Sequence, residues 1–110
     1  MVRSMFSCIL GLMILLPGLA LAGLPEYTLV IKDHRFEPAE LKVPAKKKIK
    51  LIVDNQDPTP EEFESHTLRR EKVIPGNTQA IVFIGPLKPG PYPFVGEFHE
   101  DVAKGTIIAE

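Results

Sequence analysis

The chain has 110 residues, enough for one domain, and its formal net charge of −1 gives no electrostatic reason to expect a nucleic-acid partner. Its sulfur residues, one Cys and three Met, all lie within the first 13 positions. This excludes an intrachain disulfide and, beyond that segment, any thiolate metal site or Cys nucleophile.

Residues 1–22 are expected to be a secretory signal peptide. Arg3 supplies the positive start, residues 5–16 are apolar, and Ala-Leu-Ala at 20–22 matches a small-x-small cleavage pattern. The apolar run is short for a membrane span, the alternative being an uncleaved anchor. We therefore expect a mature domain of residues 23–110 that is exported to the periplasm and does not itself span the membrane.

From residue 23 onward, short apolar runs are separated by Pro, Gly, Asn and Asp, and no stretch keeps the period of a helix. The strand candidates are residues 27–32, the proline-kinked and edge-like 36–44, then 48–54, 67–74, 78–84, 93–95 and 106–109. This pattern predicts an all-β fold, a Greek-key β-sandwich of about seven short strands.

The lysine run at 46–48 and Lys50 is interpreted as a solvated turn followed by an edge strand that lysines protect from aggregation. Docking to an acidic partner is the alternative. Nucleophilic catalysis has little support, because Ser65 and His66 are adjacent and point apart in a strand.

Three segments resemble the cupredoxins. They are Phe-Glu-Pro at 36–38 with Leu-Lys-Val at 41–43, the strand that ends in Asn55, and the stretch from Tyr92 to the Gly-Thr pair at 105–106. Their order and spacing extend the resemblance over nearly all of residues 25–110. It implies a cupredoxin-like sandwich.

The same resemblance places this chain apart from the blue-copper members of that family. Their ligand Cys, ligand His and axial Met correspond here to Gly96, His99 and Ala103. A blue-copper site needs two His and a thiolate, so ordinary cupredoxin electron transfer is not expected.

A narrower resemblance concerns the acidic stretch at 55–65 and the stretch at 96–101. Both resemble the small periplasmic cupredoxin-like proteins of bacterial Ftr-type and Efe-type ferrous iron uptake systems. This resemblance implies a copper or iron cofactor, a role in high-affinity iron uptake, and ferroxidase-type oxidation of Fe(II) as an enzymatic variant of that role. It implies as partner a membrane iron permease or a periplasmic iron-binding protein.

In the implied fold, the segment around residues 61–66 and the loop before the last strand meet at one end of the sandwich. Imidazole and carboxylate groups gathered there suit Cu(II) and iron better than Cu(I). The candidate metal ligands are His99, Glu62, Glu64, Glu97, His66 and Asp101. Strand alternation puts Glu62 and Glu64 on the face opposite Phe63, although the choice among Glu61, Glu62 and Glu64 stays open.

His34, which follows the first predicted strand, is interpreted as a surface turn residue. The alternative to metal binding is an interaction module that lost its metal site and docks to a membrane iron permease or a periplasmic partner.

Overall fold

Nine strands and one short 3₁₀ helix make up residues 23–110, the part of the chain that the computed structural model describes. The predicted signal peptide, residues 1–22, lies outside the described residues. The elements are β1 (Glu26–Lys32), β2 (Arg35–Glu37), β3 (Glu40–Val43), β4 (Ile49–Asn55), β5 (Glu61–Ser65), β6 (Arg70–Ile74), β7 (Thr78–Ile84), β8 (Gly90–Gly96), η1 (Glu97–His99) and β9 (Lys104–Ala109). No helix within residues 23–110 is long and apolar enough to cross a membrane.

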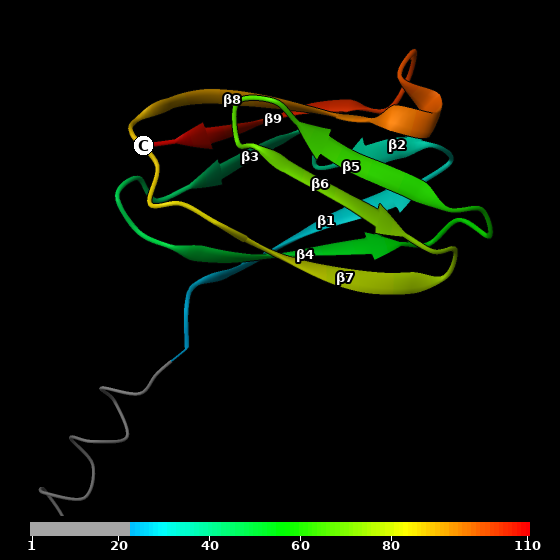
Figure 1. Ribbon diagram of the computed structural model, residues 1–110, viewed down its shortest axis with the longest axis horizontal. Helices are drawn as coiled ribbons and strands as arrows, with labels where there is room; N and C mark the ends of the chain where they lie inside the picture. Colours follow the sequence, from blue (N-terminus) through cyan, green and yellow to red (C-terminus); the bar gives the residue numbers. More distant parts are fainter. Residues whose placement is uncertain (1–22) are drawn as a thin grey trace, which may run out of the picture.

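The strands form two sheets (Figure 1), with orders β2-β1-β4-β7 and β3-β9-β8-β5-β6. The β1–β4 and β3–β9 pairs are parallel, and the other pairs are antiparallel. The predicted all-β sandwich is confirmed. It has nine strands rather than about seven, because residues 36–44 divide between two strands and residues 61–65 form an additional one.

The division of residues 36–44 follows from Pro38, since a proline cannot donate a hydrogen bond to a neighbouring strand. β2 ends at Glu37 and lies at the edge of the four-stranded sheet, whereas β3 begins at Glu40 and lies at the edge of the five-stranded sheet. The edge position expected for this segment is therefore confirmed, once in each sheet.

Two other strand predictions were wrong in detail. The strand expected from residue 67 begins only at Arg70, because Arg69 has a positive φ of 57° and the chain turns there. The lysine-rich strand is not at an edge, since β4 lies between β1 and β7. The lysines at 46–48 occupy the exposed turn before β4, as expected.

The core lies between the two sheets and is filled by alternate residues of the strands. Its centre is a group of three aromatic rings, Phe36, Phe63 and Phe94, whose centroids are 4.8 to 6.2 Å apart. Burying a side chain of this size contributes about 1.5–3 kcal/mol. With no disulfide within residues 23–110, this packing and the two hydrogen-bonded sheets hold the domain together.

Candidate metal centre

Asn55, the last residue of β4, organises the loop that leads into β5. Its buried side-chain amide donates to the backbone oxygens of Thr59 and Ile74, at 2.9 and 3.1 Å, and its Oδ1 accepts from the nitrogen of Asp57 at 3.0 Å. These bonds fix where β5 begins, and therefore where the side chain of Glu61 enters the sandwich.

Glu61 has a carboxylate buried at this end of the sandwich, with 2% of the residue exposed. Its Oε1 accepts from the backbone nitrogens of Glu62 at 2.9 Å and Phe98 at 2.8 Å, and its Oε2 lies 2.7 Å from Nδ1 of His99. An ionised carboxylate only accepts hydrogen bonds, so this contact assigns the hydrogen to Nδ1. In the neutral ring Nε2 then carries the free lone pair.

A second imidazole–carboxylate pair lies on the hairpin between β1 and β2. Asp33 and His34 have φ of 52° and 60°, the left-handed geometry of a two-residue hairpin turn. The carboxylate of Asp57 accepts both turn amides, from Asp33 at 2.8 Å and His34 at 3.0 Å, and its Oδ2 lies 3.5 Å from Nδ1 of His34. Burial alone would raise the pKa of Asp57, but these hydrogen bonds and the charges of His34 and His99 hold it below its usual value.

The rings of His34 and His99 join the two pairs. They are stacked with centroids 3.7 Å apart and planes inclined by 14°. We call Asp57, His34, His99 and Glu61 the pole cluster. It connects the hairpin of the four-stranded sheet with β5 and η1 at the five-stranded sheet, and each of its imidazoles has a carboxylate beside Nδ1.

Gly96, which the cupredoxin resemblance aligns with the ligand Cys, lies against Glu61 and against Ala103, which it aligns with the axial Met. A Cβ atom at residue 96 would come within 2.7 Å of Cβ of Ala103 and 2.7 Å of Cδ of Glu61. The carboxylate of Glu61 thus occupies space that a side chain at residue 96 would need. The pole cluster offers imidazole and carboxylate donors in place of sulfur.

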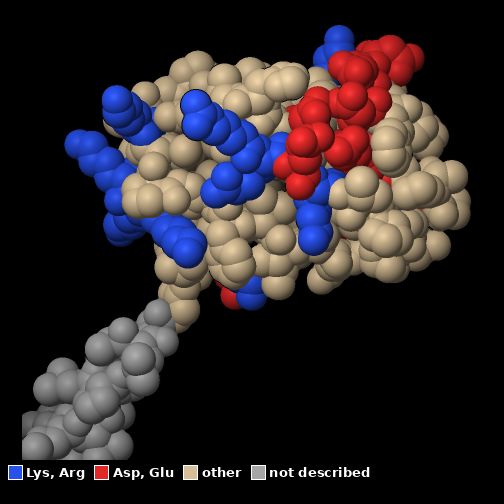
Figure 2. All heavy atoms as spheres, in the orientation of Figure 1, with Lys and Arg blue, Asp and Glu red and all other residues tan. Residues whose placement is uncertain are grey.

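The outer face of the five-stranded sheet carries a separate set of acids. Oxygens of Glu62, Glu64 and Glu71 all lie within 4.8 Å of one another, and Glu97 hydrogen-bonds to Glu64. We call these four residues the outer acidic cluster. Figure 2 shows acidic side chains gathered toward one end of this face, with Lys and Arg side chains directly beside them as well as toward the other end.

Crowding of carboxylates changes proton binding in this cluster. The hydrogen bond to Glu97, burial and the charges of Glu97 and Glu71 raise the pKa of Glu64 to about 7. Burial and the nearby Glu71 and Glu97 also raise the pKa of Glu62. At pH values below about 7 Glu64 therefore keeps its proton, and a bound cation would have to displace it.

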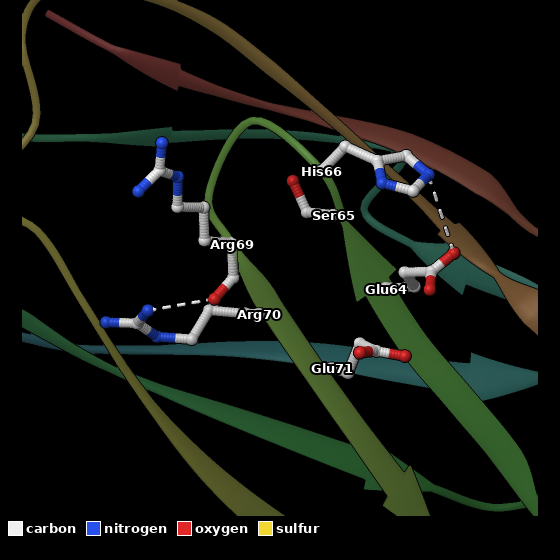
Figure 3. Close-up of a pocket in the computed structure, with 6 residues that line it drawn as sticks. All are labelled: Glu64, Ser65, His66, Arg69, Arg70 and Glu71. Atoms are coloured by element: carbon white, nitrogen blue, oxygen red, sulfur yellow. Dashed lines mark hydrogen bonds and ion pairs between the residues drawn. The ribbon is translucent and has the colours of Figure 1, made fainter.

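A surface pocket of about 340 Å³ adjoins the outer acidic cluster, lined by Glu64, Ser65, His66, Arg69, Arg70 and Glu71 (Figure 3). The side chain of His66 is 91% exposed, and its Nε2 lies 3.8 Å from Oε1 of Glu64. The guanidinium of Arg70 donates hydrogen bonds to the backbone oxygens of Phe83 and Arg69, both at 3.0 Å.

The six predicted ligands are therefore not gathered in one place. Glu62, Glu64 and Glu97 belong to the outer acidic cluster with His66 beside it, whereas His99 belongs to the pole cluster and Asp101 is exposed in the turn after η1. As predicted, Glu62 and Glu64 share the face opposite buried Phe63.

Sequence reasoning missed two members of the pole cluster. It did not single out Asp57, and it interpreted His34 as a surface turn residue. His34 does lie in a turn, but its ring packs on His99. For Glu61 the sequence did offer an indication. Side chains two residues apart in a strand lie on the same face, so Glu61 lies on the same face as the core residue Phe63.

Comparison with known proteins agrees with this architecture. A profile of the Cupredoxin-like domain matches residues 5–109. The uncharacterized protein RP394 of Rickettsia prowazekii (strain Madrid E) is 48% identical over 83 residues, which cover 76% of this chain and 66% of that protein. The chain thus spans just under two thirds of the length of that relative.

Solved structures of similar fold include copper proteins. A copper binding protein in its apo form has a TM-score of 0.68 at 17% identity, covering 77% of this chain and 86% of that one. Auracyanin A, a blue copper protein of Chloroflexus aurantiacus, has a TM-score of 0.68 at 13% identity, covering 80% of this chain and 100% of that one. At these identities the likeness concerns the fold. Because the profile covers nearly the whole sequence, the chain belongs to the cupredoxin-like domain family.

Proposed function

We propose that this protein binds Cu(II) at the pole cluster, with His99 as a metal ligand and Glu61 as the carboxylate that orients it. The observation that carries the proposal is the 2.7 Å contact between Oε2 of Glu61 and Nδ1 of His99. Histidines that bind metals commonly donate the hydrogen of their other nitrogen to a carboxylate, which fixes the tautomer and the ring orientation. The ring of His99 is held in that way, and its side chain is 29% exposed.

The donor chemistry favours Cu(II). Imidazole and carboxylate groups suit Cu(II), whereas Cu(I) prefers sulfur, and residues 23–110 contain no Cys or Met. The solved structures of similar fold include proteins named for copper binding, which supports the same metal. Without a thiolate, the copper form is expected to lack an intense blue colour.

Cu(II) titration of the purified protein by calorimetry tests the proposal. We expect one saturable site, and we expect His99→Ala to weaken binding at least about tenfold. His66→Ala is the matched control, because His66 is 91% exposed and lies beside Glu64, so binding should be unchanged. Unchanged affinity in His99→Ala, or equal losses in both variants, would contradict the site. No saturable binding by the wild type would favour the interaction module.

We further propose that the protein acts in the periplasm, in support of high-affinity iron uptake, together with a membrane iron permease or a periplasmic iron-binding protein. The motif resemblance at residues 55–65 and 96–101 supports this role, and the outer acidic cluster offers oxygen donors of the kind that iron accepts. Cell fractionation should find the protein in the periplasm. Uptake of radiolabelled iron should fall in a strain that lacks the gene, and unchanged uptake would contradict the role.

Oxidation of Fe(II) is the enzymatic variant of this role. Oxygen consumption with Fe(II), measured with the copper-loaded and the copper-free protein, tests it directly. The variant predicts faster consumption with the copper-loaded protein than in buffer. A rate equal to the buffer blank would rule out ferroxidase activity and leave metal binding as the function.

A further inference from the structure

His34 differs from an ordinary surface turn residue in one respect: its ring lies flat on His99, at a centroid distance of 3.7 Å. It comes from the hairpin between β1 and β2, whereas His99 comes from η1 after β8. The two imidazoles therefore reach the same place from the two different sheets of the sandwich.

The backbone of His34 is firmly placed, and its ring is held more loosely. The amides of Asp33 and His34 donate to the carboxylate of Asp57 at 2.8 and 3.0 Å, so the turn is fixed. Nδ1 of His34 lies 3.5 Å from Oδ2 of Asp57, beyond the usual length of a charge-assisted hydrogen bond, and its side chain is 43% exposed. The ring can therefore rotate about its side-chain bonds while the hairpin stays in place.

Rotation is what a shared metal ion would require. The lone pair of an imidazole nitrogen lies in the ring plane, so two parallel rings cannot both direct lone pairs at one ion until one of them tilts. Each ring has a carboxylate beside Nδ1. Nδ1 of His99 is engaged by Glu61 at 2.7 Å, which leaves Nε2 of that ring for coordination, whereas the loosely held His34 can offer a nitrogen once it tilts.

We infer that His34 supplies a second imidazole nitrogen to the copper ion proposed at His99, by tilting out of the stack when the metal binds. The inference rests on the proposed function. It adds to that function a site that joins both sheets and has two nitrogen donors, a donor type and number that suit the tetragonal coordination of Cu(II).

Electron paramagnetic resonance of the protein with up to one equivalent of Cu(II) counts the nitrogen donors. We expect two imidazole nitrogens in the wild type, one in His34→Asn and one in His34→Phe, with affinity at least about tenfold weaker in both variants. Asn favours the positive φ of the turn, so His34→Asn should preserve the hairpin. Phe keeps an aromatic ring for the stack but offers no donor. His66→Ala is the control and should keep two nitrogens.

The possible results separate this inference from the proposal on which it rests. If the wild type binds copper through His99 with a single nitrogen, or if His34→Phe keeps wild-type affinity and spectrum, His34 is only a stacking neighbour and the inference is overturned. If the wild type has no saturable copper site, or His99→Ala binds as tightly as the wild type, the proposed site at His99 fails and the inference falls with it.

Discussion

Glu61 is the residue on which the pole cluster depends most, because its single buried carboxylate accepts from three donors. We expect Glu61→Ala to leave these donors without a partner and to lower the free energy of unfolding by at least about 2 kcal/mol. Urea denaturation measures this. Glu62→Ala is the matched control, since the neighbouring side chain lies on the outer face and should have a much smaller effect. Equal losses would show that Glu61 has no special structural role.

Sequence alone left the choice among Glu61, Glu62 and Glu64 open. Alternation placed Glu62 and Glu64 together, but a buried carboxylate is expected only where partners satisfy it. The partner of Glu61 is His99, 38 residues away along the chain. The pairing of Asp57 with the hairpin is likewise long-range, at 23 and 24 residues. These contacts are set by the sandwich topology, which local pattern does not specify.

At the scale of the elements, β5 is the strand that was absent from the strands predicted from the sequence. Three of its five residues are glutamates, a residue type depleted in strands. It forms because it pairs with β6 on one side and β8 on the other, and because each of its inward-facing side chains has hydrogen-bond partners or core contacts. Glu61 has its three donors, Phe63 lies in the core, and Ser65 donates to the oxygen of Pro93 at 2.7 Å. Tertiary pairing here outweighs local propensity.

The contact between β5 and η1 makes stability depend on pH. Because the pKa of Glu64 rises from 4.5 to about 7 on folding, the folded state holds a proton more tightly than the unfolded chain. Stability should therefore decrease as the pH rises from about 4.5 to about 7. We expect Glu64→Gln to flatten this dependence and to raise the melting temperature at pH values above that range.

Thermal unfolding at a series of pH values checks this expectation. Glu40→Gln is the control, because Glu40 is exposed on β3, away from the outer acidic cluster. It should keep the pH dependence of the wild type. A wild type whose melting temperature stays level or increases over this pH range would contradict the assignment of a shared proton to Glu64 and its neighbours.

At the scale of the whole molecule, one small core supports both sheets. Phe63 is fully buried, with its ring centroid 5.2 Å from that of Phe94. We expect Phe63→Ala to lower the free energy of unfolding by about 3–5 kcal/mol, a large part of the total for a domain of this size. Chemical denaturation compares it with Phe83→Ala. Phe83 is 47% exposed on β7, so its loss should cost less than about 1 kcal/mol. Similar losses of stability in the two variants would contradict the assignment of Phe63 to the core and of Phe83 to the surface.

Charge is also distributed at this scale, although the net charge is only −1. β4 begins beside the lysines at 46–48 and ends at Asn55, next to the pole cluster. In Figure 2 the acidic side chains gather toward one end of the visible face, and the basic side chains gather toward the other end and also reach the edge of the acidic surface. Acids near one end of the sandwich attract cations to it. The sequence predicted the acids and the lysine turn, but their separation across the molecule depends on the fold.

The close approach of Glu61 to Gly96 has an evolutionary consequence. A cysteine at 96 would bring its Cβ within 2.7 Å of Cδ of Glu61 and of Cβ of Ala103. If Gly96 changes to Cys while Glu61 is still present, this part of the core is therefore overpacked. If Glu61 is replaced first, the donors at Phe98 and His99 lose their acceptor. Either single step is unfavourable. Descendants of this protein are thus expected to exchange carboxylate for thiolate only by coupled substitutions, which would keep the two kinds of site in separate lineages.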